Sequence, residues 1–143
     1  MADNTTIKGL EQQRAKFAYE KAKSIADAGG KKAKEYKSYA KKLPMMIKSN
    51  GLGASLSFAL SKSKDKNGNK TSWGSLYEDL NSWLRKPHKV WILGTNPPAD
   101  LSEAAINLNS QEYRALTVEV LAFLNWLRRF AEGLIEGEAD DNG

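Results

Sequence analysis

Cysteine is absent from the 143-residue sequence, and histidine occurs only once, at His88. Without cysteine the chain has no disulfide framework and no thiolate chemistry, which suits a reducing cytoplasm. A metal site or a catalytic triad needs more than one lone histidine, so we interpret His88 as an exposed loop residue. Apolar runs are too short to span a bilayer, and no signal-like segment follows the first residue. We therefore expect a cytoplasmic protein without catalytic residues, metal, cofactor or membrane contact.

Negative charge is scarce in the first part of the chain and concentrated at its end. Residues 1–50 carry twelve lysines and arginines against five acidic residues, a net charge of +7. Residues 51–100 carry seven against four, and residues 101–143 carry three against eight, a net charge of −5. This asymmetry favours a polyanionic partner on one side, and it also permits head-to-tail packing of copies. Simple solvation of the surface is an equally good explanation at this point.

Apolar residues recur at the spacing of α-helices along most of the chain, and no segment has the alternation of a strand. Helices are expected at 6–28, 31–43, from Leu52, from Ser72, from Asp100 to about Leu108, and at 111–135. The sequence therefore predicts an all-α fold, a single compact bundle of five or six helices in one domain spanning residues 1–143.

The boundaries of these helices follow from glycine, proline and polar residues. Pro44 is expected to stop or kink the second helix, or to begin the following turn, because proline lacks an N–H. Residues 86–100 contain three prolines without a helical period and predict an irregular loop, with a brief extended piece at 90–93. Residues 1–5 and 136–143 are expected to be frayed tails.

Positive charge is concentrated on one side of the helix expected at 31–43. With about 100° of rotation per residue, its apolar residues share one sector and its lysines share the opposite one. The apolar sector contains Ala33, Tyr36, Tyr39, Ala40 and Leu43, and the lysine sector contains Lys31, Lys34, Lys37, Lys41 and Lys42. Lys48 extends the strip past Pro44. Lysines at such intervals suit phosphates rather than base edges, so the strip predicts sequence-independent, salt-sensitive binding to a nucleic-acid backbone.

The four tryptophans are expected to differ in role. Trp73, Trp83 and Trp126 fall at the spacing of core residues, whereas Trp91 lies outside any periodic segment and is the better candidate for stacking on a base. Tyr36 and Tyr39 border the lysine sector and fit either role.

Three segments of the sequence resemble one known family. They are "YAKKLPMMIKSNGLGASLSFAL" at 39–60, "LYEDLNSWL" at 76–84 and "EYRALTVEVLAFLNWLRRFAEGLI" at 112–135. In this order they resemble the small α-helical subunit of type III-B CRISPR (Cmr) RNA-guided effector complexes. The resemblance implies a non-catalytic protein of antiviral defence whose copies stack into an inner filament. Its expected partners are copies of itself, other effector subunits, and the backbones of the CRISPR RNA and the target RNA.

The resemblance also implies which residues contact RNA. The candidates are Lys34, Lys37, Lys41, Lys42, Lys48, Arg128 and Arg129, although the two arginines also fit a subunit interface. By the same analogy Leu43, Leu52, Phe123, Trp126 and Phe130 are core residues.

Three other hypotheses stay open at this point. The chain fits a stand-alone helical adaptor for protein partners, with a solvated basic face. It also fits the related type III-A small subunit. A metal-independent ribonuclease would need His88 or a lysine–carboxylate pair as its acid and base.

Overall fold

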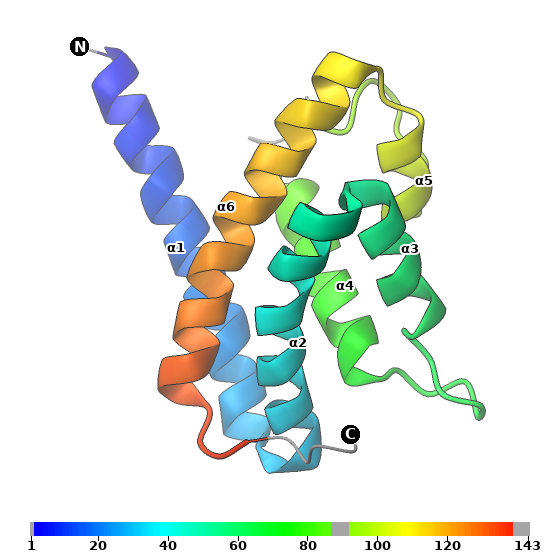
Figure 1. Ribbon diagram of the computed structural model, residues 1–143. Helices are drawn as coiled ribbons and strands as arrows, with labels where there is room; N and C mark the ends of the chain where they lie inside the picture. Colours follow the sequence, from blue (N-terminus) through cyan, green and yellow to red (C-terminus); the bar gives the residue numbers. More distant parts are fainter. Residues whose placement is uncertain (1, 87–91, 139–143) are drawn as a thin grey trace.

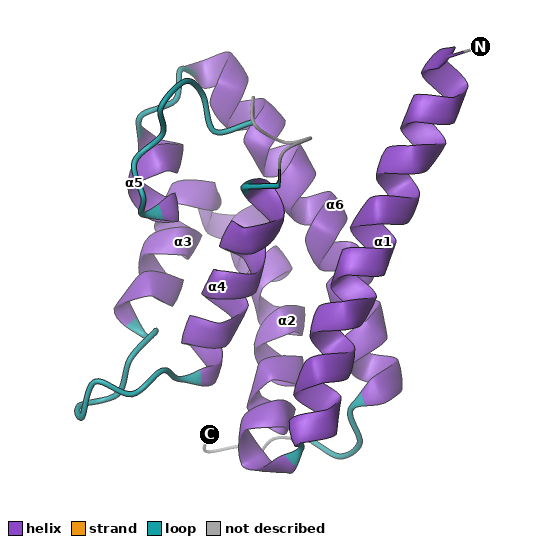
Figure 2. Cartoon of the chain, turned by 180° about the vertical axis from the view of Figure 1, so that it is seen from behind, coloured by secondary structure: helices purple, strands orange, loops and turns teal. Residues whose placement is uncertain are grey.

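Helix α6 (Ser110–Leu134) lies between α1 (Ala2–Ala28) and α2 (Gly30–Asn50), as Figure 1 shows in orange, blue and cyan. The computed structural model describes residues 2–86 and 92–138, with side chains from Gly9 onward. The other side of α2 packs against α3 (Leu52–Ser61) and α4 (Ser72–Leu84), and the short α5 (Leu101–Ile106) packs against α3. In both views the first turns of α1 stand apart from the other helices (Figures 1 and 2). The described residues thus contain six helices and no strand, which confirms the predicted all-α bundle.

Two helices are longer than predicted. Helix α1 begins at Ala2, so residues 2–5, expected to be a frayed tail, form its first turn. Helix α2 continues through Pro44 to Asn50, so the expected stop and the expected new turn at Pro44 are wrong, while the expected kink stays a prediction. Leu43 and Ile47 are buried on either side of the proline, so packing offsets the roughly 3 kcal/mol that a proline costs inside a helix. Gly51 ends the helix with a φ of 92°, which side chains other than glycine rarely adopt.

The core forms where α2, α4 and α6 meet. Tyr36, Leu43, Trp83 and Phe123 are fully buried, and the rings of Trp83 and Phe123 stack with centroids 5.7 Å apart. The tryptophan of α6 differs from the prediction: Trp126 is only half-buried, stacks on Phe130 near α1, and donates a hydrogen bond to Glu11. On the α1 side of α6, the aromatic rings of Trp126 and Phe130 are therefore packed against each other and partly exposed to solvent.

A mostly buried ion pair fixes α1 against α6. The guanidinium of Arg14 donates from Nε and Nη2 to the two carboxylate oxygens of Glu119, both at 2.9 Å. Trp83 Nε1 donates to the same carboxylate at 2.8 Å, so α4 joins the contact. Bidentate geometry of this kind sets both the distance and the rotation between two helices.

Candidate nucleic-acid interface

The lysine sector of α2 lies in two different environments. Lys34 and Lys37 lie beside the chain that follows α6, whereas Lys41 and Lys48 line a groove with α6 itself. Nζ of Lys37 donates to the carbonyl oxygens of Ile135, at 2.9 Å, and Gly137, at 2.7 Å. The carboxylate of Glu138 lies 3.9 Å away, and the Lys37 side chain is only 14% exposed. The ammonium of Lys37 is thus used within the chain.

Lys34 lies beside the same segment. A Cβ placed on Gly137 would lie 2.9 Å from Lys34 Cε, so the glycine lets the backbone cross close over the lysine stem. The two residues line one shallow hollow together with Leu134 and Ile135. Unlike Lys37, Lys34 is an exposed residue.

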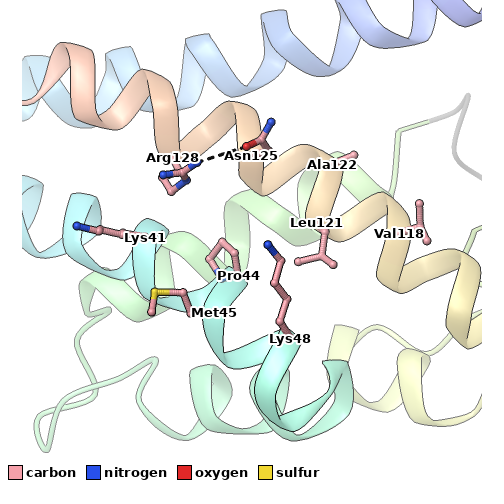
Figure 3. Close-up of a pocket in the computed structure, with 9 residues that line it drawn as sticks. All are labelled: Lys41, Pro44, Met45, Lys48, Val118, Leu121, Ala122, Asn125 and Arg128. Atoms are coloured by element: carbon pink, nitrogen blue, oxygen red, sulfur yellow. Dashed lines mark hydrogen bonds between the residues drawn. The ribbon is translucent and has the colours of Figure 1, made fainter.

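The groove beside Lys41 and Lys48 lies between α2 and α6, as Figure 3 shows. The groove has a volume of about 610 Å³. Lys41, Pro44, Met45 and Lys48 line it from α2, and Val118, Leu121, Ala122, Asn125 and Arg128 line it from α6. Met45 is 62% exposed and Val118 is 65% exposed, so the groove has apolar side chains in its floor and walls that are open to solvent.

Three cations surround this floor. Lys41 and Lys48 lie one above the other on α2 because they are seven residues apart, about two helical turns. Arg128 lies across the groove on α6, as Figure 3 shows. Its Nη1 is 3.4 Å from Glu132, an exposed ion pair that contributes little energy. None of the described residues that line the groove carries a carboxylate, so the formal charge of its lining is positive.

The remaining predicted candidates lie outside the groove. Lys42 is exposed, and its Nζ lies 5.7 Å from the ring centroid of Tyr39. It lines a neighbouring hollow with Lys41 and Lys37, to which Glu132 and Glu138 also contribute. Arg129 is exposed and does not line the groove. The structure therefore brings together Lys41, Lys48 and Arg128 out of the seven candidates.

Sequence reasoning missed the apolar floor of the groove. Val118 and Ala122 lie four residues apart on one face of α6, with Asn125 three residues further on, and this spacing would have indicated a shared face. The lysine sector alone did not show which helix lies opposite it, because that depends on tertiary packing.

Several sequence expectations concern residues 87–91, which lie outside the described residues. His88, Trp91 and most of the expected extended piece at 90–93 belong to this group. In the part that is described, no group of three histidine, cysteine, aspartate or glutamate side chains is placed to hold a metal ion. Over the same residues, no helix combines the length and apolar character needed to cross a membrane.

The chain resembles known proteins in both sequence and fold. Residues 10–134 match the family model described as "CRISPR-associated protein (Cas_Cmr5)". The chain is 34% identical over 122 residues to the "CRISPR system Cmr subunit Cmr5" of Thermus thermophilus, a match covering 85% of this chain and 92% of the relative. It also superposes on the crystal structure of a CRISPR-associated Cmr5 family protein from the same organism, with a TM-score of 0.68 and 32% identity. That superposition covers 88% of this chain and 96% of the other.

Proposed function

Because the chain belongs to the Cmr5 family, whose members are small subunits of type III-B CRISPR effectors, we propose that it is a non-catalytic, structural RNA-contacting subunit. In this proposal, copies stack into an inner filament of the cytoplasmic effector. Their positive surface faces the backbones of the guide RNA and the target RNA, and the complex serves in antiviral defence.

The groove between α2 and α6 carries the RNA part of the proposal. Lys41, Lys48 and Arg128 present three cations around one floor without a lining carboxylate. Lysine ammonium groups bind phosphates as point charges, and each contact releases counterions, so the binding is independent of sequence. We place Lys42 beside this surface as a fourth contact. We do not include Lys37 among the RNA contacts, because its ammonium group already donates hydrogen bonds to two carbonyl oxygens.

Charge asymmetry supports the stacking part. The first 50 residues carry a net charge of +7 and the last 43 carry −5. Because α6 packs between α1 and α2, these charges lie on faces of the molecule rather than at its two ends, and a basic face of one copy against an acidic face of the next would favour and orient association.

Fluorescence anisotropy with a labelled single-stranded RNA tests the RNA contact. We expect Lys41→Glu/Lys48→Glu to weaken binding strongly and to make the log–log salt slope less negative by about 1.4, since each contact on a single strand contributes about 0.7. The matched control is Lys16→Glu/Lys23→Glu, which changes the net charge equally on exposed positions of α1. Equal affinities and slopes for the two double variants would refute the assignment of the groove.

A further inference from the structure

Three aromatic rings from three helices form a row on the face of the molecule where α2, α3 and α4 meet. Tyr39 of α2 stacks on Trp73 of α4 with ring centroids 4.4 Å apart and an interplanar angle of 9°. Phe58 of α3 meets the same tryptophan edge-on, at 5.3 Å and 87°. Trp73 is buried beneath its neighbours, Tyr39 is half-buried, and Phe58 is 38% exposed. The outer two rings are thus fixed by an inner one and remain accessible to solvent.

A lysine lies over each outer ring of this row. Nζ of Lys42 is 5.7 Å from the centroid of Tyr39, and Nζ of Lys62 is 5.9 Å from the centroid of Phe58. These distances are close to the outer limit of a cation–π contact, about 6 Å, so the ammonium groups are held loosely. Each can move to a phosphate and leave the π-face of its ring to another flat group.

Lys62 also begins a lysine-rich connection between α3 and α4, which extends away from the helices at the lower right of Figure 1. The connection has a defined shape. The carboxylate of Asp65 accepts hydrogen bonds from the backbone N–H groups of Asn67 and Asn69, at 2.8 and 2.9 Å. Lys64 and Lys70 form an isolated antiparallel bridge. The one acidic side chain of the connection is therefore used by its own backbone, while Lys62, Lys64 and Lys66 are exposed.

The aromatic row and the groove are continuous through α2. Lys41 lines both the groove and the neighbouring hollow, and Lys42 lines that hollow and also lies over Tyr39. Cations thus recur from Lys48 and Arg128 across α2 to the connection between α3 and α4, past Tyr39 and Phe58. Glu132 and Glu138 also line the hollow between the groove and the row.

We propose that this row is a stacking platform for single-stranded RNA, in which a base lies on Phe58 while Lys42 and the lysines at 62, 64 and 66 hold the flanking phosphates. Positively charged tracks interrupted by aromatic rings bind single strands without sequence preference, because every base has a π-face. In a duplex the base faces are already stacked on each other, so the platform selects unpaired RNA. The inference rests on the proposed RNA contact, and it adds that the chain binds single-stranded RNA in preference to duplex RNA.

Phe58→Leu tests the platform, because leucine keeps an apolar side chain at a half-exposed position and removes the ring. Anisotropy is measured with a labelled oligouridylate and with an abasic ribose-phosphate strand of the same length and charge. We expect the wild-type chain to bind the oligouridylate at least about fivefold more tightly than the abasic strand. Phe58→Leu should bind both strands equally, with its affinity for the abasic strand unchanged and its circular dichroism spectrum intact.

The groove variant Lys41→Glu/Lys48→Glu separates this inference from the proposed function. It should lose affinity for both strands but keep their ratio. If Phe58→Leu keeps the wild-type ratio while the groove variant loses affinity, the platform is overturned and the RNA contact stands. If the wild-type chain binds neither strand, both proposals are overturned. Lys62→Ala/Lys64→Ala/Lys66→Ala is the second variant: it should weaken binding to both strands, and unchanged binding overturns the proposed phosphate contacts.

Discussion

Nζ of Lys37 lies 2.9 Å from the carbonyl oxygen of Ile135, so a lysine of α2 caps the end of α6. The last carbonyl groups of a helix lack partners within the helix, and their partial negative charge favours a cation. A second hydrogen bond, to the carbonyl oxygen of Gly137, holds the chain beyond the helix end. The contact joins positions 98 residues apart in sequence. It explains why one residue in the middle of the lysine sector is mostly buried.

Replacing this lysine should affect stability more than RNA binding. Lys37→Met keeps the stem and removes two charge-assisted hydrogen bonds, so we expect a loss of about 1.5–3 kcal/mol in the free energy of unfolding. Urea denaturation measures it. Lys42→Met, at an exposed position, is the control and should change stability by less than about 0.5 kcal/mol. If instead Lys37→Met leaves stability unchanged and lowers RNA affinity, the capping role is wrong.

Removing Arg14 should weaken the attachment of α1. Arg14→Ala takes a bidentate guanidinium away from the mostly buried carboxylate of Glu119. Hydrogen bonding to this carboxylate also raises the pKa of Arg14 above its ordinary value, so the charged pair is favoured by the fold. We expect a loss of about 2–4 kcal/mol in urea denaturation. Lys23→Ala, which breaks an exposed pair with Asp27, should cost only a few tenths of a kcal/mol; similar losses for the two variants would contradict this assignment.

Two helical glycines should respond in opposite directions to alanine. A Cβ on Gly74 would lie 2.3 Å from the carbonyl oxygen of Ser63 and 2.8 Å from Lys70 Cγ, where the connection between α3 and α4 crosses the start of α4. Gly74→Ala should therefore cost about 1–3 kcal/mol. Gly133 has open space around the same position, so Gly133→Ala should stabilise the chain by about 0.5–1 kcal/mol. Thermal unfolding measures both, and equal shifts would contradict the close approach at Gly74.

The sequence predicts the local features of this structure well and its long-range contacts poorly. The helices and their apolar faces follow from short spacings, and most helix ends fall close to the expected positions. Pro44 was misjudged because the local cost of proline says nothing about burial of Leu43 and Ile47, which belongs to tertiary packing.

The candidate site was predicted only as a set of lysines on one helix. The sequence did not show that some of these lysines are used within the chain while others line the groove. Lys37 meets Ile135, and Lys41 faces Arg128, only after α2 and α6 have packed. The aromatic row was missed for the same reason: Tyr39, Phe58 and Trp73 come from three helices. The spacing of these three residues in the sequence does not indicate that their rings are in contact.

Stability should also depend on pH through Asp79. Burial raises the pKa of this carboxyl group above its ordinary value of 3.8, although a hydrogen bond from Tyr36 and the charge of Lys21 oppose the rise. The folded chain therefore holds this proton more tightly than the unfolded chain. Its stabilising contribution is complete below the unfolded pKa and is lost as the pH rises through the folded pKa.

Asp79→Asn removes this titration, because the amide stays neutral and its oxygen still accepts from Tyr36. The free energy of unfolding of the variant minus that of the wild type should rise between about pH 3 and pH 7. Urea denaturation at several pH values gives this difference. A difference that stays constant over the range would show that Asp79 does not contribute to the pH dependence.

Purification of the tagged chain from its host, followed by ultraviolet crosslinking, tests the central claim most directly. We predict a multi-subunit particle that carries short RNAs of uniform length. Peptides crosslinked to that RNA should come from α2 near Lys41 and Lys48 and from α6 near Arg128. A particle without RNA, or crosslinks confined to α1 around Lys16 and Lys23, would contradict an RNA-contacting role for the groove.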